Sequence, residues 1–104
     1  MLPDARVDEV ERVLGRLVGW ARSQGDVRGL ALVGSWARGV PHASSDVDVV
    51  LLSTEPSHYI ADDDWLGEVG AACLVRTVSW GLVTERRFAL PDGLEVDLAI
   101  GAPA

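Results

Sequence analysis

The sequence predicts a single α+β domain built in two layers. An amphipathic helical pattern occupies residues 4–24. Apolar or alternating segments typical of strands follow at residues 28–33, 46–52, 73–90 and 94–100. The chain has 104 residues, enough for one hydrophobic core but not for a second module. Residues 1–104 are therefore expected to form one domain.

The first predicted element is a helix over residues 4–24. Its apolar side chains follow the spacing of one helix face, at Val7, Val10, Leu14, Leu17 and Ala21, widened by Val13 and Val18. Acidic residues precede arginines along the segment, an order that complements the helix dipole. Gly25 stands where a C-terminal cap belongs. We interpret the segment as a packing helix with a solvated outer face.

A short apolar run at residues 28–33 predicts a strand covered on both faces. Gly34 follows it, where no side chain obstructs the close approach of backbone to a ligand. If residues 35–38 form a helical turn, their free N–H groups and the serine hydroxyl face one spot that favours an anion. Gly39 and Pro41 are expected to end that turn.

Two aspartates begin the second predicted strand. Residues two apart in a strand point to the same side, so Asp46 and Asp48 share one face. The alternate residues Val47, Val49 and Leu51 then point into a core. Two carboxylates this close repel each other unless a proton or cation lies between them, and oxygen ligands suit Mg²⁺ or Mn²⁺. The pair therefore predicts a metal site.

Residues 53–72 are expected to form a loop with short helical pieces. Pro56 lies near the first helix start, and the run 62–64, three aspartates, is interpreted as a solvated cap. Tyr59 is expected to pack on the core.

Residues 73–90 predict one or two strands, and the sequence Pro-Asp-Gly at 91–93 marks a tight turn. Residues 94–100 alternate as the last strand of a hairpin. Within it Glu95 and Asp97 share a face.

Gly34-Ser35, ten intervening residues and Asp46-x-Asp48 resemble the signature of the DNA polymerase beta-like nucleotidyltransferase superfamily. The forms GSWARG and SDVDVVLL are most similar to small prokaryotic nucleotidyltransferase-domain proteins, including minimal nucleotidyltransferases and relatives of aminoglycoside nucleotidyltransferases. The resemblance covers about residues 28–100. It implies a nucleotidyltransferase fold, with a mixed sheet of about four to five strands and helices packed on one face.

The resemblance also implies the site. A third carboxylate on a later, neighbouring strand is matched by Asp97, with Glu95 as the competitor. The implied catalytic and metal-binding residues, holding two Mg²⁺ or Mn²⁺ ions, are Asp46, Asp48 and Asp97. The implied nucleotide-binding residues are Gly34, Ser35, Arg38 and Ser45. Arg38 either holds the triphosphate or pairs with a carboxylate, and Ser45 either contacts nucleotide or hydrogen-bonds within its loop.

The implied reaction transfers a nucleoside monophosphate from a nucleoside triphosphate, with ATP expected, to a hydroxyl of a small molecule or protein. Pyrophosphate is released. Glu85 is a candidate for the base that takes the acceptor's proton, as is Glu95. Arg86 and Arg87 either contact phosphate or acceptor, or form cross-strand salt bridges with neighbouring acids.

The composition of the chain limits the kinds of partner and the cellular location that are expected. Sixteen acidic residues against nine basic ones, all arginine, give a net charge of −7, which disfavours unaided binding to nucleic acid. The single cysteine, Cys73, has apolar neighbours that predict a buried structural thiol. The N-terminus lacks a signal-peptide pattern, and no apolar run approaches the roughly 18 residues that cross a bilayer. A cytoplasmic protein without a membrane partner is expected.

Two alternatives to an active enzyme stay open. One is a minimal nucleotidyltransferase that acts as an antitoxin, binding a helical toxin-like partner protein. The other is a catalytically inactive nucleotide-binding domain. The 48% hydrophobic content leaves apolar surface for a homodimer or a helical partner.

Overall fold

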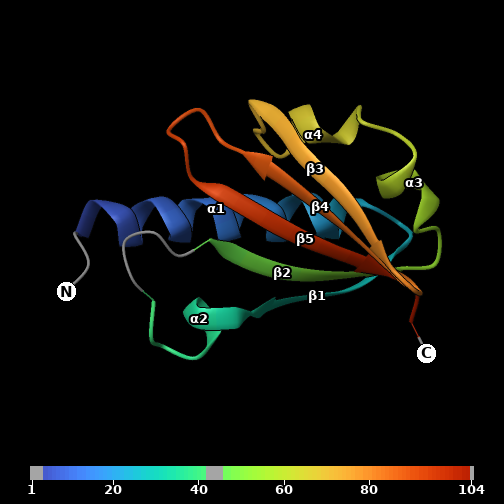
Figure 1. The fold of residues 1–104 in the computed structure, drawn as a ribbon, viewed down its shortest axis with the longest axis horizontal. Coiled ribbons are helices and arrows are strands. Elements are labelled where there is room, and N and C mark those ends of the chain that lie inside the picture. The colour runs from blue at the N-terminus through green and yellow to red at the C-terminus, as the bar shows by residue number, and fades with distance from the viewer. Residues whose placement is uncertain (1–3, 42–45, 104) are drawn as a thin grey trace.

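The computed structural model describes residues 4–41 and 46–103 and contains a five-stranded mixed sheet with one long and three short helices (Figure 1). The elements are α1 (Asp4–Ser23), β1 (Val27–Val33), α2 (Gly34–Ala37), β2 (Val47–Ser53), α3 (Ser57–Ile60), α4 (Trp65–Glu68), β3 (Cys73–Trp80), β4 (Val83–Ala89) and β5 (Glu95–Gly101). The strand order is β1-β2-β5-β4-β3, in which β2 and β5 are parallel and the other neighbours are antiparallel. The predicted α+β fold is confirmed.

Helices cover one face of the sheet, and α1 runs along that face (Figure 1). The alternate residues Val47, Val49 and Leu51 of β2 are at most 2% exposed, whereas the residues between them are only half-buried. The prediction that β1 is covered on both faces is wrong, because no residue of this strand is fully buried. β1 is an edge strand, and its apolar run reflects one covered face and one open face.

Helix α1 follows the predicted bounds within one residue, but its buried stripe is shifted. Trp20 is 7% exposed and stacks on Trp65 with ring centroids 5.4 Å apart, whereas Val18, predicted to widen the stripe, is 39% exposed. The helix ends at Ser23, and Gly25 does not adopt the positive φ of a glycine cap. None of the described helices has the length and apolarity needed to cross a bilayer.

A small polar cluster ties β1 to β2 and α3. The Asp26 carboxylate accepts hydrogen bonds from the Ser53 hydroxyl at 2.6 Å and from the Tyr59 hydroxyl at 2.7 Å. Burial alone would raise the pKa of Asp26, but these bonds outweigh it and lower the pKa below its usual value. Tyr59 is 2% exposed, as predicted for a residue that packs on the core.

The substitution Asp26→Asn is expected to lower the free energy of unfolding by about 1 kcal/mol at pH 7, since hydrogen bonds to a charged acceptor are the stronger ones. A carboxylate with a lowered pKa contributes stability that is fully present above its unfolded value and is lost as the pH falls through its folded value. The difference between variant and wild type should therefore shrink at pH 3. Urea unfolding at both pH values measures it, with Asp8→Asn on the exposed face of α1 as the control for loss of one charge.

Two details of the segment before and at β3 differ from prediction. Asp63 is not only a solvated cap residue, because its carboxylate forms an ion pair with the buried Arg86. Asp64 occupies the N-cap position of α4 without a side-chain capping bond. Cys73 is exposed rather than buried, because it begins an edge strand most of whose side chains are exposed.

Candidate active site

Three neighbouring strands bring the predicted carboxylates together on the open face of the sheet. The parallel pairing of β2 and β5 places Asp48 beside Asp97, and the antiparallel pairing of β5 and β4 places Asp97 opposite Arg87. Asp46, just before β2, reaches the same group, because its carboxylate accepts a hydrogen bond from Arg87 Nη1 at 2.5 Å. Residues far apart in the sequence therefore form one cluster.

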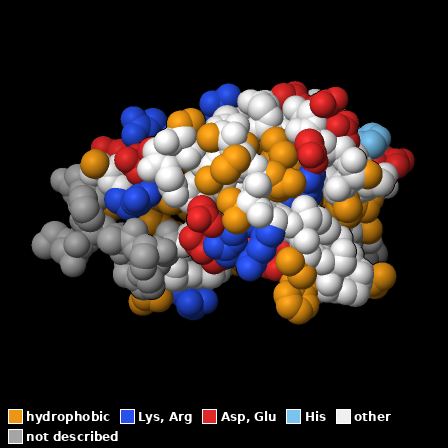
Figure 2. Space-filling view, turned by 45° about the horizontal axis from the view of Figure 1, so that its top comes forward, with side chains coloured by type: hydrophobic (Ala, Val, Ile, Leu, Met, Phe, Trp, Pro, Cys, Tyr) orange, Lys and Arg blue, Asp and Glu red, His pale blue; other side chains and the backbone are white. Residues whose placement is uncertain are grey.

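Arg87 lies between the carboxylates. Its Nη2 donates to Asp97 Oδ2 at 2.9 Å, while its Nη1 donates to Asp46 and to Glu95 Oε1, the latter at 3.3 Å. Burial would lower the pKa of Arg87, but the hydrogen bonds to Asp46 and Asp97 raise it above its usual value. The guanidinium is therefore charged. Figure 2 shows acidic and basic side chains gathered near the middle of the visible surface.

Negative charge remains uncompensated beside this ion pair. Burial, followed by the charges of Asp97 and Asp46, raises the pKa of the Asp48 carboxyl. Asp97 Oδ1 is buried and accepts no hydrogen bond from the described residues. Its side chain is only 8% exposed. Buried acceptors of this kind, with like charges around them, are stabilised by a cation.

The Gly-Ser bend lies directly against Asp48. Val33 is the register partner of Asp48, and Gly34 follows with a φ of +74°, which strongly favours glycine. A Cβ at Gly34 would overlap the Asp48 carboxylate. The bend and the acids are therefore in contact, and the glycine is required by backbone geometry as well as by space.

Helix α2 is one short turn with a defined end. Gly39 has a φ of +71°, its N–H bonds to the Trp36 carbonyl, and the Val40 N–H bonds to the Ser35 carbonyl, the pattern of a Schellman motif. This confirms the predicted stop at Gly39. Ser35 is half-buried. Arg38 is exposed and forms no ion pair with the described residues, and Ser45 lies outside them.

No group of three or more histidine, cysteine or acidic side chains within residues 4–41 and 46–103 forms a ready metal site. The Arg87 guanidinium takes up carboxylate oxygens that a metal ion would need. The donor set still fits a divalent cation. Three carboxylates, those of Asp46, Asp48 and Asp97, could supply oxygen ligands. The raised pKa of Asp48 reflects burial and then repulsion that a cation would relieve, and Asp97 Oδ1 is buried without a hydrogen bond from the described residues.

The two arginines of β4 have opposite surroundings. Arg86 is 3% exposed on the helix-covered face, donates to the carbonyls of Tyr59 and Asp62, and has a structural role that the sequence did not reveal. Arg87 faces the acids. Counting outward from Asp92 by five residues in each direction reaches Arg87 and Asp97, so the predicted hairpin already contained this pairing.

Glu85 lies on the open face two residues before Arg87. Its carboxylate accepts a hydrogen bond from the Trp80 indole N–H at 2.6 Å. This contact is formed across the hairpin of β3 and β4. Glu85 therefore lies on the open face, outside the cluster formed by Arg87 and its carboxylate partners.

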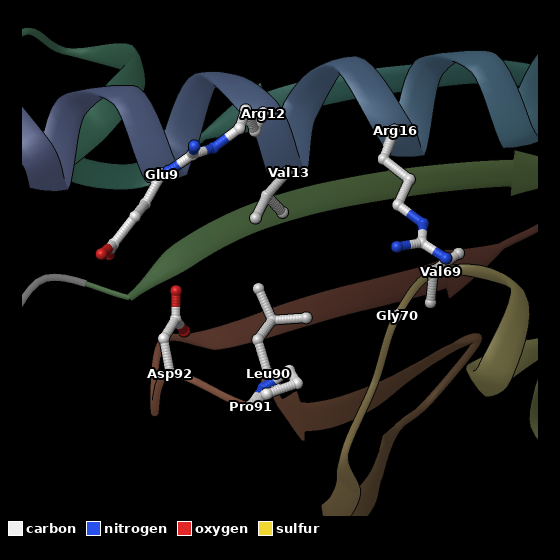
Figure 3. Close-up of a pocket in the computed structure, with 9 residues that line it drawn as sticks. All are labelled: Glu9, Arg12, Val13, Arg16, Val69, Gly70, Leu90, Pro91 and Asp92. Carbon is white, nitrogen blue, oxygen red and sulfur yellow. The ribbon is translucent and has the colours of Figure 1, made fainter.

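A separate hollow of about 360 Å³ lies between α1 and the turn that joins β4 to β5 (Figure 3). Arg16 points from α1 toward Gly70, and Asp92 faces the helix from the turn (Figure 3). None of the three clustered carboxylates lines this hollow. The chemistry-bearing residues are on the open face of the sheet instead.

Solved structures of nucleotide-transferring enzymes share this fold. An aminoglycoside 6-adenyltransferase from Bacillus subtilis is 15% identical with a TM-score of 0.67, over 86% of this chain and 34% of that chain. The polymerase core of TRAMP, an RNA surveillance complex, is 15% identical with a TM-score of 0.71, over 95% of this chain and 32% of that chain. The Cid1 poly(U) polymerase is 14% identical with a TM-score of 0.63, over 96% of this chain and 31% of that chain.

This chain spans about a third of the length of each of these structures, and at such identities the likeness establishes the fold alone. No curated protein matches the sequence. A family model described as a nucleotidyltransferase domain matches residues 14–100, which is most of the chain and includes every clustered carboxylate. The resemblance read from the Gly-Ser and Asp-x-Asp motifs is thereby confirmed, and the chain belongs to the nucleotidyltransferase domain family.

Proposed function

We propose that this chain is the catalytic domain of a metal-dependent nucleotidyltransferase. It transfers a nucleoside monophosphate from a nucleoside triphosphate, with ATP preferred, to a hydroxyl of a small molecule or protein, and pyrophosphate leaves. The observation that carries this proposal is the convergence of Asp46, Asp48 and Asp97 beside the Gly34 bend. A domain that only binds other proteins has no need of three acids in that arrangement.

Each residue has a defined part in the proposed reaction. Asp46, Asp48 and Asp97 hold two Mg²⁺ or Mn²⁺ ions, which when bound activate the acceptor oxygen and offset charge on the triphosphate. Gly34 lets the phosphates approach the backbone of α2, whose first N–H groups have no partner within the helix. The Ser35 hydroxyl adds a donor at the same place. Arg38 and Ser45 stay candidates for contacts with the phosphates.

Asp97 is a better third carboxylate than Glu95. It is the direct register partner of Asp48, and its side chain is 8% exposed with one oxygen free of hydrogen bonds from the described residues. Glu95 precedes Asp97 by two residues on the same strand and its side chain is 37% exposed. Burial and the adjacent charge of Asp48 destabilise the ionised form of Asp97 more than that of the exposed Glu95 when no cation is present. Asp97 is therefore expected to bind a cation more strongly.

Calorimetric titration of the wild-type chain with each nucleoside triphosphate tests the proposal. Binding is expected only in the presence of Mg²⁺, tightest for ATP, and abolished by a chelator. The substitution Asp97→Asn should weaken metal-dependent binding by at least about tenfold, since it removes a proposed metal ligand, and loss of a group that only supports a ligand already costs about 10- to 100-fold. Glu95→Gln on the same strand removes the same charge and should retain binding.

Equal binding by wild type and Asp97→Asn, or binding that survives chelation, would contradict the proposed site. Release of pyrophosphate from ATP in the presence of candidate hydroxyl acceptors separates an active transferase from an inactive nucleotide-binding domain. A homodimer or a helical partner protein stays a prediction from the sequence.

A further inference from the structure

We propose that Arg87 is an internal counter-cation that occupies the metal site of the metal-free protein and leaves it when divalent cations bind. This inference rests on the proposed function, because it concerns the same carboxylates. It adds a competition between the chain's own guanidinium and the metal ion for these carboxylates.

The contacts of Arg87 carry the inference. Its two terminal nitrogens bond to carboxylates from residues 41 positions earlier and 10 positions later, so one planar group joins the two sides of the site. The acceptor atoms are Asp46 Oδ2 and Asp97 Oδ2. Magnesium binds carboxylate oxygens at about 2.0–2.1 Å and requires near-octahedral geometry, which leaves no room for N–H donors on the metal-facing lone pairs. A lone pair that accepts an N–H donor cannot bind the metal at the same time, and two cations on one oxygen repel each other, so we expect the metal to displace the guanidinium from these two atoms.

Charge explains why the guanidinium occupies the site. Without the guanidinium, four neighbouring carboxylates would repel one another with no cation between them. They belong to Asp46, Asp48, Glu95 and Asp97. Arg87 donates to Asp46, Glu95 and Asp97 but not to Asp48, and Asp97 Oδ1 accepts no hydrogen bond from the described residues. The metal-free site is thus stable yet incompletely neutralised, and a divalent cation in place of the guanidinium neutralises more of it.

The role is particular to Arg87 among the arginines of this region. Arg86 lies on the opposite face, where it is buried against backbone carbonyls. Arg76 is the register partner of Arg87 on β3, yet it is exposed and forms no ion pair within residues 4–41 and 46–103. Arg76 therefore supplies a control on the same sheet with the same charge.

The first experiment measures Mn²⁺ affinity by calorimetry, without nucleotide, for wild type, Arg87→Gln and Arg76→Gln. Removal of the competing cation in Arg87→Gln should tighten Mn²⁺ binding at least about tenfold, whereas Arg76→Gln should match wild type. Arg87→Lys keeps the charge but loses the fork that joins two carboxylates, so its affinity should fall between wild type and Arg87→Gln. Circular dichroism confirms that each variant is folded.

A second experiment uses the wild-type chain alone and does not depend on how a variant folds. Phenylglyoxal modifies accessible guanidinium groups, and mass spectrometry of the digested protein reports the rate at each arginine. Addition of Mg²⁺ should accelerate modification of Arg87, because the side chain leaves its carboxylate partners. The rate at Arg76 should not change.

The outcomes separate the two proposals. Mn²⁺ binding that is equal in wild type and Arg87→Gln, or weaker in the variant, overturns the role of Arg87 and leaves the proposed function standing. An unchanged or slower modification of Arg87 with Mg²⁺ also overturns it. Absence of Mn²⁺ binding in every protein overturns the counter-cation, while the titrations with nucleoside triphosphate and Mg²⁺ decide the proposed function separately. Binding that appears only in Arg87→Gln supports the counter-cation.

Discussion

The substitution Asp48→Asn is expected to lower nucleotide transfer by at least about 10³-fold and, at the same time, to make the metal-free protein more stable. Metal ions stabilise the transition state of such reactions by several kcal/mol, and each 1.36 kcal/mol corresponds to a factor of ten in rate. A neutral amide in place of a central carboxylate ligand removes much of that contribution. The gain in stability has a separate cause, the repulsion between Asp48 and the neighbouring acids in the absence of metal.

The sign of the stability change follows from the pKa of Asp48. Burial and the neighbouring charges of Asp97 and Asp46 raise that pKa in the folded protein, so ionisation of Asp48 opposes folding. The cost is absent below the ordinary pKa of 3.8 and is fully present once the pH exceeds the folded pKa. The amide removes the cost, so we expect a gain of roughly 0.5–1 kcal/mol at pH 7 after solvent screening, or about 2–8 °C in Tm.

Thermal unfolding in a chelator and pyrophosphate release with Mg²⁺ measure the two effects on the same samples. Asp8→Asn, on the exposed face of α1, controls for the loss of one negative charge and should change neither quantity appreciably. The gain in Tm should disappear as the pH falls below 3.8, because the Asp48 carboxyl is then protonated in the folded and the unfolded protein and is as neutral as the amide of the variant. A variant that loses activity and stability together would indicate that Asp48 supports the fold rather than the reaction.

The faces of the acidic strands were predictable because side chains alternate along a strand. Alternation alone placed Asp46 and Asp48 on one side and Val47 on the other, and the structure has the same arrangement. Turn chemistry placed the hairpin around residues 91–93, which sets the register between β4 and β5. These local rules needed no knowledge of the rest of the fold.

The lateral order of the strands was beyond local rules. β5 lies between β2 and β4, so Arg87 meets Asp97 by hairpin pairing but meets Asp46 only through the parallel contact of β2 and β5. The exposure of Cys73 has the same origin, since its apolar neighbours predict burial while its strand lies at an edge. An apolar segment alone does not distinguish a central strand from an edge strand.

Gly34 shows a third limit of prediction from sequence. A glycine at this position was predicted for one reason, and the structure gives two more. The sequence motif indicated space for a phosphate. The structure adds a φ of +74° and direct contact with Asp48. Neither a backbone dihedral angle nor a contact between adjacent strands can be read from the identity of a single residue.

The substitution Gly34→Ala is therefore expected to impair both stability and activity. An alanine at positive φ costs about 1–2 kcal/mol, and its Cβ would overlap the Asp48 carboxylate unless that side chain moves. Displacement of a catalytic group by about 1 Å is enough to lower a rate roughly 10²-fold. Pyrophosphate release and Mn²⁺ affinity should both fall for this reason.

Gly39→Ala is the matched control for this prediction. Gly39 has nearly the same backbone angle, with a φ of +71°, but no described atom lies within 4 Å of a Cβ at that position. Its alanine variant should lose the same 1–2 kcal/mol or so in urea unfolding while it retains Mn²⁺ affinity. The difference between the two variants isolates the contact with Asp48 from the dihedral penalty. Equal Mn²⁺ affinity in both would show that the Gly34 bend does not position Asp48, and the bend would then have to act on the phosphates alone.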